Sequence, residues 1–232
     1  MSDDGYHRRS MTPPQTSTPS PIVSDQPSVH PDLENRVLKH LRTHWQKPIP
    51  DHTRAVADQL IDEIPSRERP LILDSFCGTG MSSGFIAQSF PDHWVIGVDQ
   101  SAHRLDKHQL GDATNYQLVR AECETLWQCL VEAGVTVTHH FLLYPNPWPK
   151  AAMLNRRIHG HPSFPLLARL GGRIELRSNW SIYVSEFARA ARLIGIDGTA
   201  EAFTPTAPIT LFERKYQQKG QTLWRFLSQD PP

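Results

Sequence analysis

The sequence of 232 residues contains few cysteines, no long apolar run and no net charge. Its three cysteines, Cys77, Cys123 and Cys129, show no CxxC spacing and no disulfide framework, which suits a reducing cytosol. No segment approaches the roughly 20 apolar residues that a membrane-spanning helix needs. The first 31 residues also lack the apolar core of a secretory signal. We therefore expect a soluble cytoplasmic protein with no membrane partner.

The absence of net charge hides an uneven distribution along the chain. Residues 1–144 contain 12 Lys and Arg against 18 Asp and Glu, whereas residues 145–232 contain 12 against 6. A polyanionic partner would therefore contact the second half. Ordinary solvated surface charge would give the same distribution, so charge alone does not decide between the two interpretations.

Prolines are concentrated in the first 31 residues, which hold six of the twenty. This Ser/Thr/Pro-rich stretch has no hydrophobic periodicity, so we predict a disordered tail over residues 1–31. Residues 32–232 are then expected to form one domain. It begins with two helices in residues 32–64: the first places Leu33, Val37 and Leu41 on one face, and the second runs from Asp51 to about Ile64.

From residue 71 onward, short apolar runs alternate with helical patterns. The runs predict strands at residues 71–74, 94–98, 116–119, 138–144 and 172–177, separated by helices. This alternation predicts an α/β core with a mostly parallel sheet over residues 71–232. Two further strand patterns, at residues 199–204 and 222–228, are separated by a long loop. They predict an antiparallel hairpin at one edge of the sheet.

The segment from Asp74 to Gly80 lies between a predicted strand and a predicted helix. Its glycines, Gly78 and Gly80, would let the backbone approach a ligand closely. Asp99 ends the next strand, where a carboxylate can accept hydrogen bonds from ribose hydroxyls. The GxGxxG motif of dinucleotide-binding proteins is absent, so the pattern favours S-adenosylmethionine over NAD. A tight turn followed by a surface aspartate would account for the same residues without a ligand.

The loop Pro145-Asn146-Pro147-Trp148-Pro149-Lys150 follows the strand at residues 138–144. Proline restricts φ and removes backbone donors, so the loop is expected to be stiff and to hold its side chains in place. Stiff loops at strand ends are where α/β proteins keep their reactive groups. The preceding His139 and His140 have no metal-ligand spacing, and we interpret them as structural and expect no metal.

Together these motifs make the chain resemble the bacterial tRNA (guanine-N7)-methyltransferases, over about residues 33–227. The glycine loop resembles the family's Leu-Glu-Ile-Gly-Cys-Gly-x-Gly, the proline loop its Pro-Asp-Pro-Trp-x-Lys, residues 178–180 its Thr-Asp-Trp, and residues 210–215 its Thr-x-Phe-Glu-x-Arg/Lys. The resemblance implies a class I S-adenosylmethionine-dependent methyltransferase fold, a tRNA partner, and a monomer or weak dimer. It implies cofactor contacts by Asp74, Gly78, Gly80, Asp99, Glu122 and Asn146, with Asn146 as the catalytic residue. The implied substrate contacts are Lys150, Arg156, Arg157, Asn179, Thr210 and Glu213.

The chain departs from the family pattern at several positions of these motifs. Phe76 replaces a glycine that faces the cofactor, and Met153 replaces a histidine. Asn146 and Asn179 replace two aspartates on the substrate side. Because the surrounding motifs are intact, the changes suggest a divergent branch with a shifted substrate.

The substitution at Asn146 bears directly on the reaction. Guanine N7 has a free lone pair and needs no general base, but its methylation creates positive charge that a carboxylate would stabilise. An amide cannot offset that charge, which leaves Glu213 as a possible acid. An Asn-Pro-x-aromatic loop also resembles that of amino-methyltransferases acting on adenine or cytosine, with Asn146 accepting from the exocyclic amine and Trp148 stacking on the base. If Phe76 blocks the cofactor, the protein would be a non-catalytic RNA-binding remnant.

Overall fold

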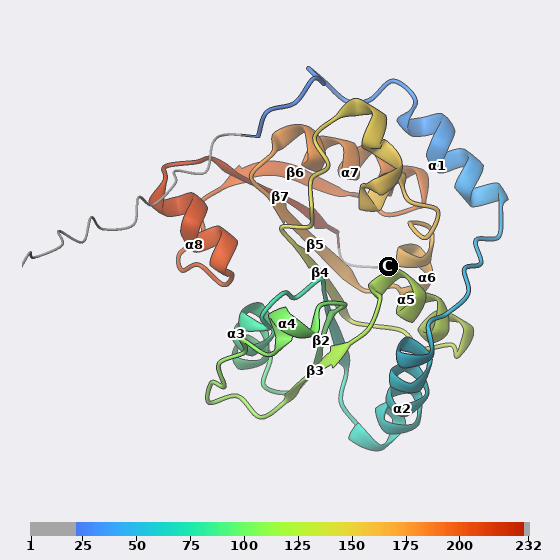
Figure 1. Cartoon of the computed structure of the whole chain (residues 1–232), viewed down its shortest axis with the longest axis vertical. Helices are drawn as coiled ribbons and strands as arrows, with labels where there is room; N and C mark the ends of the chain where they lie inside the picture. Colours follow the sequence, from blue (N-terminus) through green and yellow to red (C-terminus); the bar gives the residue numbers. More distant parts are fainter. Residues whose placement is uncertain (1–21, 230–232) are drawn as a thin grey trace, which may run out of the picture.

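The computed structural model describes residues 22–229, which form a seven-stranded sheet in the order β3-β2-β1-β4-β5-β7-β6 (Figure 1). The first five strands pair in parallel. Strand β7 lies antiparallel between β5 and β6. The strands are β1 (Leu71–Ser75), β2 (Trp94–Asp99), β3 (Tyr116–Arg120), β4 (His139–Leu143), β5 (Arg173–Ser178), β6 (Gly198–Phe203) and β7 (Leu223–Ser228).

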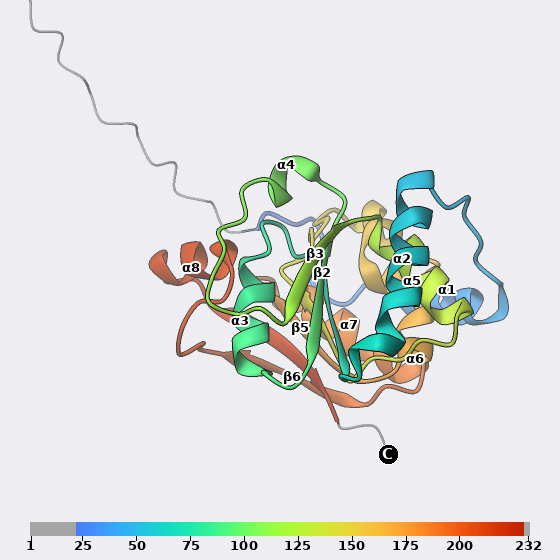
Figure 2. The ribbon, with the colours of Figure 1, turned by 90° about the horizontal axis from the view of Figure 1, so that it is seen from below.

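Helices cover both faces of this sheet because strand residues alternate between two apolar cores. Ile72, Val95 and Phe141 belong to the core on the α3 side, whereas Leu73 and Ile96 belong to the larger core on the other side. Figure 2 shows α3 on one side of β2 and β3, and α2 and α5 on the other. The helices are α1 (Leu33–Arg42), α2 (Asp51–Arg67), α3 (Met81–Ser89), α4 (Ala102–Leu105), α5 (Cys123–Glu132), α6 (Leu166–Leu170), α7 (Ser181–Leu193) and α8 (Leu211–Gln218), with 3₁₀ turns η1 (Ala151–Arg156) and η2 (Ile158–Gly160).

The predicted α/β fold with a C-terminal antiparallel hairpin is confirmed. One element was missed, because the expected long loop between the last two strands contains α8. Thr210 caps this helix by accepting a hydrogen bond from the Glu213 amide at 3.0 Å. No helix within residues 22–229 combines the length and apolarity required to cross a bilayer.

The N-terminal segment departs from the expected disordered tail. Residues 1–21 lie outside the described part of the chain. Residues 22–31 pack against the domain: the Gln26 side chain is buried, and the His30 amide donates to a Glu186 carboxylate oxygen at 2.8 Å. The predicted boundary at residue 31 is therefore wrong for these ten residues, because specific side-chain hydrogen bonds order a segment that has no hydrophobic periodicity.

A buried polar cluster joins β1 and β4 to α5 beneath the carboxyl ends of the strands. The Ser75 hydroxyl lies 2.8 Å from His140 Nε2 and accepts from the Trp127 indole N–H at 3.0 Å. Burial lowers the pKa of His140 to about 3, so the imidazole is neutral at physiological pH. The structural role predicted for His140 is confirmed. In the described chain, no group of three or more His, Cys, Asp or Glu side chains is arranged to hold a metal ion.

Because buried His140 is neutral, we expect the free energy of unfolding to depend on pH. Its folded pKa lies below the unfolded value of 6.5, so the unfolded chain binds the extra proton and stability is lost as pH falls from about 6.5 towards 3. His140→Gln should reduce the slope of unfolding free energy against pH by up to about 1.4 kcal/mol per pH unit. Urea unfolding between pH 4.5 and 7 measures this slope. A His140→Gln variant with the slope of the wild type would contradict the assignment.

Candidate functional site

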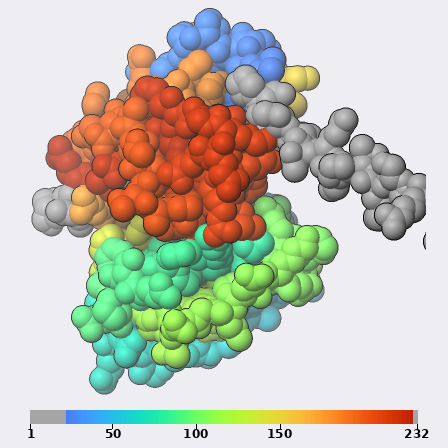
Figure 3. Space-filling model, turned by 90° about the vertical axis from the view of Figure 1, so that its left-hand side faces the viewer, coloured from blue at the N-terminus to red at the C-terminus, as the bar shows by residue number. Residues whose placement is uncertain are grey.

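A cavity of about 820 Å³ opens where the loops after β1, β2 and β4 meet. Its walls are completed by the start of α5, the turn η1 and the start of α8. In Figure 3 the red C-terminal region that contains α8 lies directly above the green region of α3 and α4. Ligands of open parallel sheets bind at the carboxyl ends of neighbouring strands, so the cavity has the position of a binding site.

The glycine loop after β1 forms the first wall. Gly78 has φ of +63° and a Cβ built there would meet nothing within 4 Å, so its backbone faces open space. Its N–H donates to Asp99 Oδ2 at 3.0 Å. Asp99 Oδ1 accepts from the Ser101 amide at 2.8 Å and from Arg104 at 3.1 Å. The carboxylate of Asp99 is thus fixed by backbone amides at the edge of the cavity, where its remaining lone pairs can accept from a ligand's hydroxyls.

Phe76 occupies the position where the bacterial tRNA (guanine-N7)-methyltransferases, which this sequence resembles, have a glycine. It has φ of +62°, a conformation that is strained for a side chain other than glycine. Its ring packs edge-on against Trp127, with ring centroids 5.8 Å apart, and lines the cavity without filling it. Phe76 therefore does not block the cavity, as it would in a non-catalytic remnant.

The proline loop forms the opposite wall. Asn146 is exposed and lines the cavity together with Trp148. Two strained residues bracket Asn146, Tyr144 with φ of +54° and Trp148 with φ of +44°. The Arg156 guanidinium lies over the Trp148 ring, 4.8 Å from its centroid. Such strain persists only where surrounding contacts hold it, and it concentrates at functional sites.

Three of the predicted cofactor residues lie outside the cavity lining. Asp74 is fully buried below it and accepts from the hydroxyls of Ser82 and Ser83 at 2.6 and 2.7 Å. Burial raises the pKa of Asp74 to about 6, although the two serine hydroxyls favour the ionised form. Gly80 has φ of +74°, a backbone conformation that favours glycine, and a Cβ there would also approach the end of the Leu118 side chain to 2.3 Å. In this structure Asp74 and Gly80 support the glycine loop from outside the cavity lining, and a cofactor contact by either residue stays a prediction.

The third of these residues, Glu122, pairs with Lys47 at 2.6 Å and does not line the cavity. Glu124, two residues later, lines it instead, and burial raises the pKa of its carboxyl. Arg104 and Phe212 also line the cavity without having been predicted. The sequence signal for Glu124 was its position at the start of α5, whose first turn faces the strand ends.

The predicted substrate residues are divided between the cavity and the protein interior. Arg156 and Thr210 line the cavity. Lys150 is exposed on the proline loop, and the Asn179 side-chain amide donates to Gln221 at 3.0 Å away from the lining. Glu213 is fully buried, so the suggestion that it offsets charge on the substrate is wrong. It accepts from the Tyr144 hydroxyl and from Arg177, both at 2.9 Å, which fixes α8 to the ends of β4 and β5.

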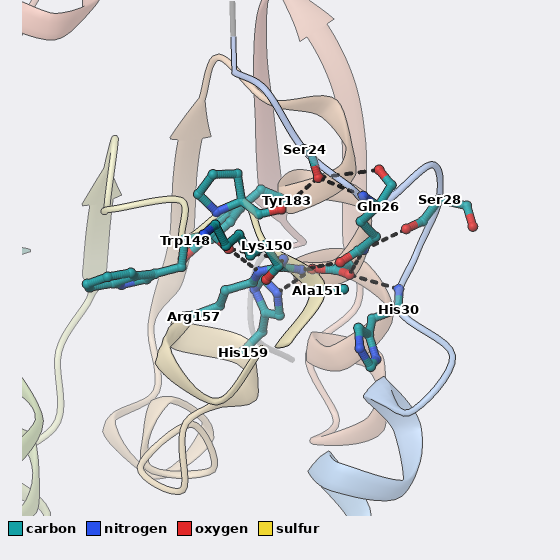
Figure 4. A network of polar contacts seen from close by, with 12 residues as sticks. Ser24, Gln26, Ser28, His30, Trp148, Lys150, Ala151, Arg157, His159 and Tyr183 are labelled. Atoms are coloured by element: carbon teal, nitrogen blue, oxygen red, sulfur yellow. Dashed lines mark hydrogen bonds and ion pairs between the residues drawn. The ribbon is translucent and has the colours of Figure 1, made fainter. Parts of the chain in front are cut away.

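Arg157 was predicted to contact phosphate and is fully buried instead. Figure 4 shows the network of polar contacts around its side chain. Its guanidinium pairs with Glu186 at 2.6 Å, and Glu186 also accepts from His159 Nε2 at 2.8 Å. Burial alone would raise the pKa of Glu186, but the hydrogen bonds and the Arg157 charge lower it to about 2. Burial lowers the pKa of His159, which is neutral and donates from Nε2. The phosphate contact is excluded, because the charge of Arg157 is already matched inside the protein.

Glu186 was missed at the sequence level although a signal for it was present. It lies on the buried face of α7, about one helical turn after Tyr183 and one before Ala190, with Phe187 next to it. A carboxylate on an apolar helix face requires a buried cationic or donor partner. That requirement predicts a partner such as Arg157.

Comparisons with known proteins agree with this architecture. The model of a family described as "Putative methyltransferase" (Methyltransf_4) matches residues 68–226. A tRNA (guanine-N(7)-)-methyltransferase of Mycolicibacterium gilvum is 26% identical, covering 93% of this chain and 94% of the relative. One of Thiobacillus denitrificans is 28% identical, covering 71% and 77%.

Among solved structures, the 16S rRNA methyltransferase KamB aligns with a TM-score of 0.55 at 15% identity, covering 80% of this chain and 96% of KamB. A 16S rRNA (adenine(1408)-N(1))-methyltransferase of Catenulisporales acidiphilia, solved with the cosubstrate SAM, aligns with a TM-score of 0.53 at 16% identity, covering 76% and 94%. These likenesses show that the chain has the class I methyltransferase fold.

The burial difference between adjacent arginines gives a direct test of the Arg157 assignment. Arg157→Met should lower the free energy of unfolding by about 3–5 kcal/mol, because Glu186 is left as an uncompensated buried charge. The same change at exposed Arg156 removes only a surface contact with Trp148 and should cost less than about 1 kcal/mol. Chemical denaturation of both variants measures the difference. Similar losses in the two variants would show that Arg157 is not the buried partner of Glu186.

Proposed function

Because this chain belongs to the Methyltransf_4 family of methyltransferases, we propose that it transfers a methyl group from S-adenosylmethionine to N7 of guanine in tRNA. The observation that carries the proposal is that one cavity contains both the glycine loop after β1 and the Asn146 loop after β4. Relatives with this named activity align with the chain over most of their own length, 94% and 77% for the two described above.

The residues of the first wall fit the cofactor. The open backbone at Gly78 admits a ligand, and Asp99 offers a fixed carboxylate to ribose hydroxyls. Phe76 and Glu124 line the same side of the cavity. When bound, S-adenosylmethionine supplies a methyl group activated by an adjacent sulfonium. The protein's part is to hold donor and acceptor in line, which accounts for most of the acceleration of such a displacement.

The second wall fits a purine base. The Trp148 ring offers an apolar face, and Asn146 offers an amide donor that suits guanine O6 and leaves the N7 lone pair free to attack the methyl group. Guanine N7 carries its own lone pair, so no general base is required of this wall. The Arg104, Arg156 and Lys215 side chains also line the cavity. These cations would attract the phosphates of an RNA substrate, which in this proposal is bound in the cytoplasm.

A second candidate is an amino-methyltransferase acting on adenine or cytosine. The observation in its favour is the absence of an acid near Asn146 on the second wall, since Glu213 is buried and paired with Arg177. An exocyclic amine can donate to the Asn146 carbonyl while its base stacks on Trp148.

The proposed function is tested by calorimetry with S-adenosylhomocysteine and by mass spectrometry of tRNA nucleosides. We expect binding of the nucleoside, and loss of 7-methylguanosine from the tRNA of a deletion strain with recovery when the gene is returned. Loss of a methylated adenosine or cytidine instead would establish the second candidate. Absence of cofactor binding would rule out both.

The cofactor wall predicts a specific loss of affinity. Asp99→Ala should weaken S-adenosylhomocysteine binding by about 1.5–3 kcal/mol, since hydrogen bonds to a charged group are lost. Calorimetry gives the dissociation constant directly. Asp106→Ala, which changes an exposed aspartate after α4, serves as the control and should bind normally. An unchanged constant for Asp99→Ala would remove this carboxylate from the cofactor site.

The acceptor wall predicts opposite responses to one substitution. If guanine N7 is the acceptor, Asn146→Asp should preserve or raise turnover, because a carboxylate stabilises the developing cation. If the acceptor is an exocyclic amine, the same change should reduce turnover. Asn146→Ala should impair either reaction by about a hundredfold through lost positioning. Transfer of labelled methyl to total tRNA measures all three proteins, and full activity of Asn146→Ala would exclude this loop from the mechanism.

A further inference from the structure

We propose that residues 24–30, here called the N-terminal strap, position Asn146 and Trp148 for the transfer reaction although they lie outside the cavity lining. The inference rests on the proposed function and adds a set of positioning residues to it. Its origin is the polar network of Figure 4, in which the strap, the proline loop and α7 meet.

The strap bonds directly to the backbone of the loop that carries Asn146. The Ser24 hydroxyl donates to the Pro149 carbonyl at 2.6 Å. The Ala151 amide donates to Asp25 Oδ1 at 2.8 Å. The hydroxyl and the carboxylate therefore hold the loop at two points, one immediately before Lys150 and one immediately after it.

The loop needs such external partners because of its composition. Pro145, Pro147 and Pro149 have no N–H, so the loop cannot build its own ladder of hydrogen bonds. Trp148 is also held in the left-handed region, with φ of +44°. A strained residue in a loop with few donors keeps its conformation only if neighbouring groups fix the adjacent carbonyls.

Arg157 supplies three further hydrogen bonds to the loop, and the strap helps to hold Arg157. The Trp148 carbonyl accepts from Arg157 Nε at 3.2 Å and Nη2 at 3.1 Å, and the Lys150 carbonyl accepts from Nη2 at 3.2 Å. Arg157 Nη1 in turn donates to Gln26 Oε1 at 3.0 Å and to Glu186 at 2.6 Å. The guanidinium of Arg157 thus donates to the proline loop from one side and to the strap from the other.

Glu186 closes the network by accepting from the strap as well. Its Oε1 accepts from Gln26 Nε2 at 2.5 Å and from the His30 amide at 2.8 Å. Its Oε2 accepts from Arg157 and His159. A buried carboxylate with donors on both oxygens fixes all of the attached segments relative to one another. The orientation of Trp148, and through it of Asn146, consequently depends on residues that precede α1.

The experiment weakens the strap without disturbing the buried ion pair. Ser24 is half-buried and Asp25 is exposed, so the double variant Ser24→Ala, Asp25→Ala should fold with a melting temperature close to that of the wild type. We expect its kcat on total tRNA to fall by about tenfold or more, because the loop is misplaced. S-adenosylhomocysteine affinity should stay within about twofold, since the first wall is untouched. The conservative pair Ser24→Thr, Asp25→Asn keeps a hydroxyl and an acceptor and should restore kcat.

Two controls separate positioning from general stability. Thr43→Ala removes an exposed hydroxyl that donates to the Lys39 carbonyl at 3.0 Å, and it should leave kcat unchanged. Fluorine NMR of protein labelled with 5-fluorotryptophan, assigned with Trp148→Phe, reports the ring of Trp148 without any substrate. Its resonance should shift or broaden in the double alanine variant and not in Thr43→Ala.

A double alanine variant with wild-type kcat and an unmoved Trp148 resonance would overturn the proposal. A fall in kcat matched by an equal loss of cofactor affinity would also overturn it, because the strap would then act on the whole fold. If the wild-type protein binds no cofactor, the proposed function fails. The fluorine measurement still decides whether the strap holds the loop.

Discussion

The ion pair between Glu186 and Arg157 is the interaction on which the acceptor side of the cavity depends. Both groups are fully buried, so the free energy of desolvation must be offset by well-placed partners. The structure provides them from α7, from the segment after η1, from the proline loop and from the N-terminal segment. Apolar residues of similar volume in place of Glu186 and Arg157 would stabilise the fold to a similar or greater extent. Unlike the ion pair, they would not dictate the direction of two backbone carbonyls in the proline loop.

The two walls of the cavity are held by different physical means. The glycine loop continues directly from β1, and its Gly78 amide bonds to the carboxylate that ends β2, so the parallel sheet itself sets its position. The proline loop leaves β4 through Tyr144, a strained residue whose hydroxyl is tied to Glu213 on α8. Beyond Asn146 the loop is held by the side chains of Ser24, Asp25 and Arg157, and its Lys150 carbonyl also accepts from the Met153 amide at 2.9 Å. The donor side of the site is therefore rigid by topology, and the acceptor side is rigid through specific side chains.

The sequence predicted strand positions well because β1 and β2 are short, fully buried apolar runs and β5 alternates buried apolar with charged residues. It predicted the cavity walls because glycines mark one loop and prolines mark the other. It did not predict which side of a loop a residue faces. The adjacent Arg156 and Arg157 illustrate this limit, since a 3₁₀ turn points one outward over Trp148 and the other into the core. Glu213 was assigned to the substrate for a similar reason. A motif preserves the residue type equally well whether the side chain binds a ligand or anchors a helix.

The antiparallel position of β7 has a consequence for how the protein is made. β5 pairs with β4 on one side, and on the other it pairs only with β7, across registers such as Glu175 to Leu227. During synthesis β5 and β6 emerge well before their shared partner does. Until residues 223–228 leave the ribosome, β5 has an open hydrogen-bonding edge and Phe226 is missing from the core. Completion of the sheet is thus a late, long-range event, and until then the open edge of β5 can pair with another chain.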